Sequence, residues 1–181
     1  MIRLLTLQIR FPTGEDSNLV FLVSVDGTDC PIQEPRPFNR QWFSHKFNGP
    51  AVKYEVAICV LTGRCVWING PFRGGVHDIT IFRSALIDLI PDGRYAIGDR
   101  GYRGEPTKIS APNLLDNEQE ARFKALVRAR HETFNSRLKA FSILKERFRH
   151  RPVLERHKAC FEAVAVVVEY SLEFGSPLFE L

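Results

Sequence analysis

Short apolar segments separated by turn residues fill the first half of the chain. Leu19–Val25 is a β-branched run that ends at Asp26-Gly27, so it predicts a buried strand stopped by a turn. Val52–Leu61 and Arg64–Asn69 flank a Thr-Gly dipeptide, which indicates a β-hairpin. Residues 28–50, rich in Pro, Asn and Gly, are expected to form an irregular connection. The sequence thus predicts three antiparallel strands.

A helix and a further strand follow the hairpin. Gly70-Pro71 is expected to end the preceding strand. Asp78–Leu89 has helical periodicity, and Arg94–Gly98 predicts a short strand. Two long helices are then expected, from about Asn117 to His150 and from Leu154 to Phe174. A strand–helix–strand unit after a meander indicates an α/β fold, with a mixed sheet flanked by helices.

Composition narrows the class of protein. With 44% hydrophobic and 25% charged residues over 181 positions, the chain is typical of one globular domain, which we assign to residues 19–181 after an N-terminal arm, residues 1–18. The longest apolar runs are far shorter than the ~20 residues of a membrane-spanning helix, so no membrane association is expected. Four cysteines without a CxxC pair favour a reduced intracellular compartment.

Positive charge is concentrated late in the chain. Residues 121–158 hold twelve Lys and Arg residues and only three acidic residues. Such a stretch indicates either a surface that binds a polyanion or an ordinary solvated helix face, and charge alone does not separate the two.

Two carboxylates follow predicted strands. Asp26 comes after the first apolar run and Asp99 after Arg94–Gly98, at the sheet edge where α/β proteins gather ligands. A crowded pair of carboxylates favours a divalent cation such as Mg²⁺. Each residue alone is also a common turn residue, and that alternative stays open.

A third acidic residue lies in the basic stretch. Arg128, Glu132, Asn135 and Lys139 are spaced so that they share one stripe of a helix. A carboxylate among cations suits a metal site that faces phosphates, but Glu132 with Arg128 is equally an ordinary i, i+4 ion pair.

For several other polar and aromatic residues we expect a structural role. We expect Asp78 to be a helix N-cap rather than a metal ligand, and His131 to lie on the surface rather than to support Glu132 from behind the metal site. Trp42, Phe43 and Trp67 are expected to pack in the core rather than to stack on bases.

The surroundings of the three acidic residues carry a resemblance. The relevant blocks are Val25–Ile32, Ser44–Lys46, Tyr54–Val56, Gly70-Pro71, Gly74–Ile79, Ile81–Arg83, Gly98–Gly104 and Arg128–Glu132 with Asn135, Arg137, Leu138 and Lys139. In these blocks, and in their order, the chain resembles the DDE-type transposases of the PIF/Harbinger group, including the transposase-derived nucleases.

This resemblance implies a fold, a reaction and a set of site residues. It implies an RNase H-like core in which Asp26, Asp99 and Glu132 are catalytic and hold two Mg²⁺ or Mn²⁺ ions. Lys46, Arg128 and Lys139 would bind the phosphates of double-stranded DNA. Cleavage, and strand joining where it occurs, would follow a two-metal mechanism.

The resemblance also implies partners and a location. We expect a nuclear protein, able to form a homo-oligomer, with a separate DNA-binding partner, because only 25 residues precede Asp26. The alternative is a domesticated or truncated transposase that acts as a non-catalytic DNA- or protein-binding module.

Overall fold

The computed structural model describes residues 20–37, 39–151 and 153–181, so the predicted arm, residues 1–18, lies outside the described residues. The strands are β1 (Phe21–Pro31), β2 (Phe43–Ser44), β3 (Gly49–Cys59), β4 (Cys65–Arg73), β5 (Tyr95–Ile97) and β6 (Ile109–Ser110). The helices are α1 (Asp78–Ser84), α2 (Leu86–Leu89), α3 (Glu118–Leu138), α4 (Ser142–Lys145) and α5 (Val153–Phe174). Two short 3₁₀ turns span Arg40–Trp42 and Arg100–Tyr102.

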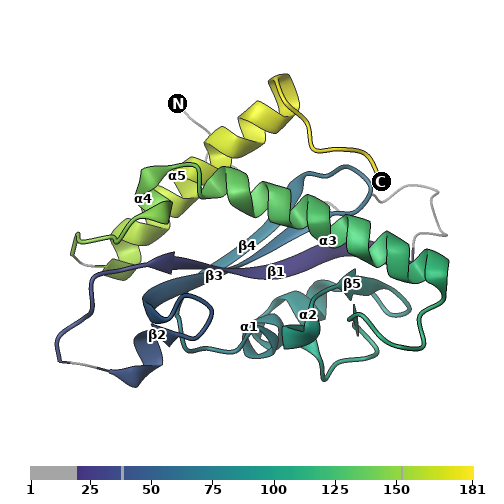
Figure 1. Cartoon of the computed structure of the whole chain (residues 1–181), viewed down its shortest axis with the longest axis horizontal. Coiled ribbons are helices and arrows are strands. Elements are labelled where there is room, and N and C mark those ends of the chain that lie inside the picture. The colour runs from purple at the N-terminus through teal and green to yellow at the C-terminus, as the bar shows by residue number, and fades with distance from the viewer. Residues whose placement is uncertain (1–19, 38, 152) are drawn as a thin grey trace.

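The strands form one mixed sheet (Figure 1). Its order is β2-β3-β1-β5-β6, and β4 pairs with β3. β1 pairs antiparallel with β3 and parallel with β5. The predicted mixed α/β fold is therefore confirmed, and the arrangement is consistent with an RNase H-like core.

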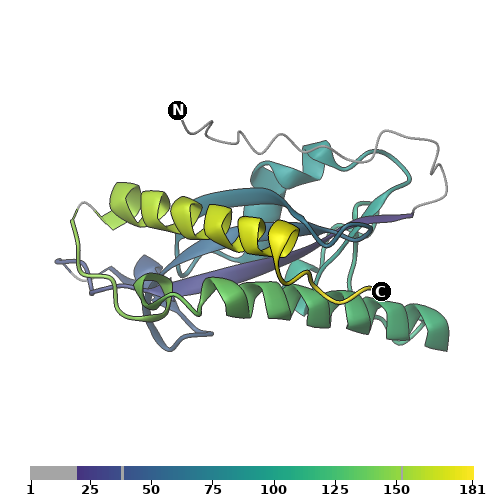
Figure 2. The ribbon, with the colours of Figure 1, turned by 90° about the horizontal axis from the view of Figure 1, so that it is seen from above.

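Helices cover both faces of this sheet (Figures 1 and 2). One core cluster joins apolar side chains of β1 and β3 to α3, α4 and α5, through residues such as Phe134, Leu144 and Phe161. A second cluster joins the opposite face of β1 to α1 and α2, through Phe82 and Leu86. Among the helices of the described ranges, none is both long and apolar enough to cross a membrane.

β1 separates two different environments because side chains alternate along a strand. Asp26 faces α3, where it bonds Asn135. Its neighbours Val25 and Gly27 face α1, where Val25 packs in the second core cluster. β1 thus directs the polar side chain of Asp26 toward α3, while its opposite face is covered by α1.

Two predicted strand ends are wrong. Asp26-Gly27 does not end a strand, since these residues pair with Val56 and Glu55 of β3 and β1 continues to Pro31. Pairing along the whole of β3 outweighs the local turn signal. β4 likewise continues through Gly70-Pro71 to Arg73, because β3 is its one partner among the described strands and an edge strand tolerates proline.

The helix from Asn117 to His150 was predicted too long. α3 ends at Leu138 and only the short α4 follows. The chain then turns back so that Phe148 exchanges backbone hydrogen bonds with Pro31 and Gln33 beyond β1. The predicted helix over Asp78–Leu89 is split at Ala85 into α1 and α2, whereas the last helix is confirmed as α5.

Arg130 is a cation within the apolar stripe of α3, and the structure shows what its side chain binds. Its guanidinium is buried beneath the β3–β4 hairpin and donates to the carbonyls of Cys59 and Val60. The Cys59 carbonyl also accepts from the backbone N–H of Gly63, whereas the Val60 carbonyl depends on the guanidinium, so Arg130 ties α3 to the hairpin.

Candidate active site

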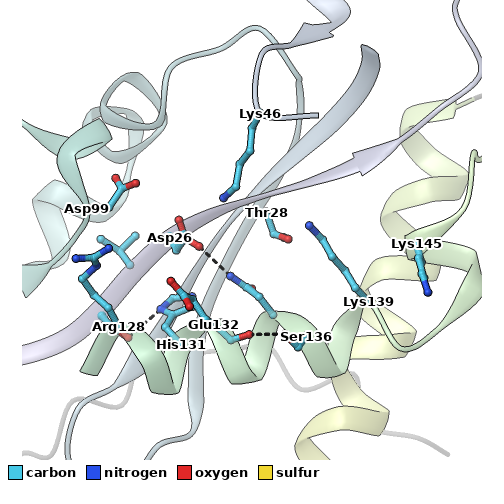
Figure 3. Close-up of a pocket in the computed structure, with 13 residues that line it drawn as sticks. Asp26, Thr28, Lys46, Asp99, Arg128, His131, Glu132, Ser136, Lys139 and Lys145 are labelled. Carbon is cyan, nitrogen blue, oxygen red and sulfur yellow. Dashed lines mark hydrogen bonds between the residues drawn. The ribbon is translucent and has the colours of Figure 1, made fainter. Parts of the chain in front are cut away.

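A cleft of about 570 Å³ opens between β1, α3 and the end of β5 (Figure 3). All six residues predicted from the sequence line it: Asp26, Asp99, Glu132, Lys46, Arg128 and Lys139. The fold therefore brings together acidic and basic side chains that lie more than a hundred positions apart in the sequence.

Strand register brings Asp26 next to Asp99. Ser24 pairs with Ile97 in the parallel β1–β5 ladder, and each aspartate lies two residues beyond its paired residue. Asp99 begins the turn at Arg100–Tyr102, where its Oδ1 accepts from the backbone N–H of Gly101 at 2.7 Å. Asp26 within β1 and Asp99 just beyond the end of β5 thus lie at the same level of the sheet.

The carboxyl group of Asp26 is held in an unusual electrostatic environment. Burial raises its pKa to about 6, Lys46 opposes this rise, and the charges of Asp99 and Asp78 add to it. Asn135 donates to Asp26 Oδ2 at 3.0 Å, and Lys46 donates to the carbonyl of Gly27 at 3.3 Å. Figure 3 shows Lys46 reaching toward Asp26 from the turn before β3. A cation in the cleft would relieve the repulsion among the carboxylates.

Glu132 lines the cleft from α3, one turn beyond Arg128, and is exposed to solvent. The ion pair with Arg128 that the spacing allows is not formed, and within the described part of the chain the Glu132 carboxylate makes no hydrogen bond or ion pair. Among the residues that the structure describes, no three His, Cys, Asp or Glu side chains stand close enough to hold a metal ion together. The three acidic residues therefore share a cleft without forming a ready-made metal centre.

The donor atoms around the cleft suit a hard cation. Besides the carboxylates, Asn135 Oδ1 and Thr28 Oγ1 line it; both are buried and have no hydrogen-bond partner in the described residues. Oxygen donors are the ligands that Mg²⁺ and Mn²⁺ prefer, and no thiol lines the cleft. The residues present thus fit a divalent metal.

The prediction that His131 lies on the surface is wrong. Its side chain is 2% exposed, and Nδ1 is 2.8 Å from Ser24 Oγ on β1. Burial lowers the pKa of His131 to about 3, so the ring is neutral at pH 7. The contact fixes α3 against β1 directly beneath Glu132. The spacing of Val127, Arg130, His131 and Phe134 is that of one buried helix stripe, a signal that could have identified it.

The prediction that Asp78 is an N-cap is also wrong. His77 occupies the cap position, and Asp78 is the first residue of α1. Its carboxylate instead accepts from Lys53 Nζ at 2.9 Å. Trp42 and Trp67, expected in the core, are half-buried and pack against the core clusters, whereas Phe43 is half-buried and belongs to neither cluster.

Lys145 of α4 is a lining residue that the sequence reasoning did not single out. It adds a fourth cation to Lys46, Arg128 and Lys139, so the basic side chains of the cleft outnumber its three carboxylates. Because Lys145 was expected to lie within one continuous helix, its approach to the cleft depends on the break after Leu138.

Comparison with known proteins gives two findings. Residues 25–169 match the family model of the DDE superfamily endonucleases, and this segment contains all six predicted site residues. The chain is also similar to a probable transposase for insertion sequence element IS702 from Microchaete diplosiphon, with 29% identity over 154 residues, covering 79% of this chain and 53% of that protein. The chain therefore spans about half the length of this curated relative.

Proposed function

This chain belongs to the DDE superfamily endonucleases, and from that premise we propose that it is a metal-dependent DNA endonuclease, the catalytic domain of a transposase. The observation that carries the proposal is the convergence of Asp26, Asp99 and Glu132 on one cleft with a surplus of basic side chains. The family implies a DNA substrate, and the basic side chains suit its phosphates.

In this proposal the three carboxylates hold two Mg²⁺ or Mn²⁺ ions. When bound, such ions lower the pKa of an attacking water and stabilise the departing oxygen of a phosphodiester. Asp26 and Asp99 provide the fixed part of the site, because strand pairing and hydrogen bonds hold both side chains. Glu132 provides the adjustable part, because an exposed glutamate can change rotamer at little cost.

The basic residues bind and orient the DNA. Lys46 approaches Asp26 from the β2–β3 turn, whereas Arg128 and Lys139 lie along α3 on either side of Glu132. Phosphates seated between them would place one scissile bond above the carboxylates. Because these contacts are electrostatic and lie on the rim, they contribute affinity that falls steeply with salt and little sequence selectivity.

Several finer expectations remain predictions. These are the PIF/Harbinger subtype, strand joining, a nuclear location, a homo-oligomer and a separate DNA-binding partner. The competing function is a non-catalytic DNA- or protein-binding module. The observation that favours it is the lack of a ready-made group of three metal ligands in the described residues.

A nicking assay on supercoiled plasmid tests the proposal. We expect nicking with Mg²⁺ or Mn²⁺ and none with EDTA, and we expect D26N, D99N and E132Q each to lower the rate by orders of magnitude while DNA binding persists. The control is D92N, since Asp92 is fully exposed and pairs with Lys108 outside the cleft. Binding without metal-dependent nicking would favour the non-catalytic module.

A further inference from the structure

Asp78 lies on the face of β1 opposite the cleft. Its carboxylate accepts from Lys53 Nζ at 2.9 Å, and the same ammonium donates to the carbonyl of Val76 at 2.9 Å. Lys53 Nζ is also 3.9 Å from Asp29 Oδ1. The lysine is almost completely buried, so these contacts hold Asp78 in one place.

The β1–β3 register explains why a polar group is buried there. Asp29 pairs with Lys53, and Gly27 pairs with Glu55, so these residues share the face that α1 covers. Ser44 donates to Asp29 Oδ2 at 2.5 Å. We call Asp29, Ser44, Lys53, Glu55 and Asp78 the back-face cluster, and it lies directly behind Asp26.

Two glycines show how closely the Asp78 carboxylate approaches the active-site backbone. A Cβ atom on Gly27 would lie 2.5 Å from Asp78 Oδ1, and one on Gly101 would lie 3.1 Å from Asp78 Oδ2. Gly27 directly follows Asp26, and Gly101 lies in the turn that Asp99 begins. One carboxylate therefore lies between the two chain segments that carry the paired aspartates.

Stability alone does not account for this arrangement. Apolar side chains of the same volume could fill a face that is buried against a helix, and buried ion pairs are often no more stable than such replacements. His77, not Asp78, occupies the cap position of α1, and it makes no side-chain cap hydrogen bond. A geometric role for the carboxylate is the simpler account of its position.

We propose that Asp78 is a positioning residue: held by Lys53, its carboxylate sets the separation of the β1 segment at Gly27 and the turn at Gly101, and so prepares Asp26 and Asp99 to bind divalent cations together. This inference rests on the proposed function, because it concerns the same metal site. Asp78 acts through the backbone and does not itself face the cleft.

Mn²⁺ binding without DNA, measured by calorimetry on the full chain, tests the proposal. We expect D78A to weaken Mn²⁺ binding by about tenfold or more, as substitutions behind metal ligands commonly do. D78N keeps the shape and can still accept from Lys53, so we expect it to recover most of that loss. D92A, which removes an exposed acid outside the cleft, serves as the matched control and should bind as the wild type does.

A double-substitution cycle makes the test independent of folding stability. G27A alone should weaken Mn²⁺ binding because its Cβ would displace the Asp78 carboxylate. Combined with D78A, the same change should cost much less, since the obstructing oxygen is gone. Thermal unfolding of the metal-free variants shows whether each is folded; if D78A is not, the comparison of G27A with D78N replaces it.

The outcomes separate the two claims. Wild-type affinity in D78A, or strictly additive effects of G27A and D78A, would overturn the positioning role while leaving the proposed function in place. A loss in D78N as severe as in D26N would also overturn it, because Asp78 would then be a metal ligand itself. A wild-type chain that binds no Mn²⁺ and nicks no DNA would remove the proposed function, and this inference with it.

Discussion

The buried imidazole of His157 makes the stability of the fold depend on pH. Its ring, on the buried face of α5, contacts the rings of Tyr54 and Phe148, with Nδ1 2.9 Å from the Tyr54 hydroxyl. Burial lowers the pKa of His157 to about 4 from an ordinary value of 6.5. The unfolded chain therefore binds a proton more readily between these values, and stability that is complete above pH 6.5 is lost as the pH falls toward 4.

The size of the effect follows from the same two values. At pH 5 the imidazole is almost fully protonated in the unfolded chain and largely neutral in the fold, which costs about 2 kcal/mol relative to pH 7.5. Urea unfolding at both values, for the wild type and H157F, measures this difference. We expect the wild type to lose about 2 kcal/mol more than H157F, which has no proton to bind.

Two comparisons test whether His157 causes the dependence of stability on pH. His150 contacts the same Phe148 ring but is exposed, so H150Q should keep the wild-type dependence on pH. The buried His131 remains in every variant and contributes equally to each. Parallel stability profiles for the wild type and H157F would show that the burial of His157 does not determine its protonation.

Three further substitutions have defined outcomes. R130M should destabilise the fold by about 1–3 kcal/mol in urea unfolding, because the buried Val60 carbonyl loses its donor while the Cys59 carbonyl keeps the N–H of Gly63; an unchanged midpoint would contradict this role. K139A with K145A should weaken DNA binding at all sequences alike and reduce the slope of log affinity against log salt by roughly two, and a loss confined to one sequence would indicate base reading instead. N135L removes the hydrogen bond to Asp26 and should lower Mn²⁺ affinity in calorimetry by about tenfold with the fold retained; equal affinity would show that Asn135 does not orient this carboxylate.

Local patterns in the sequence were enough to predict the kinds of elements and their order. The hairpin around Thr62-Gly63 and the helix that ends at Phe174 have strong local signals, and both are present. Strand and helix ends were less predictable, because they depend on partners. β1 runs past Gly27 since β3 offers it a full ladder, and α3 ends early so that Phe148 can pair beyond β1.

Their positions after predicted strands placed Asp26 and Asp99 at one edge of the sheet, and only the family resemblance grouped them with Glu132. That the two aspartates are neighbours follows from the parallel register of β1 and β5. The surroundings of His131 and Asp78 were missed for a related reason. A histidine beside a glutamate and an aspartate before a helix both have common surface interpretations, and only the packing of α3 and α1 against β1 shows that they are held from behind.

The central claim is that Asp26, Asp99 and Glu132 close on shared divalent cations. A crystal structure of the chain grown with Mn²⁺, with anomalous scattering recorded to locate the ions, tests this most directly. We expect Mn²⁺ in the cleft, coordinated by oxygens of Asp26, Asp99 and Glu132. An empty cleft, or Mn²⁺ in the cleft without Glu132 among its ligands, would contradict the account.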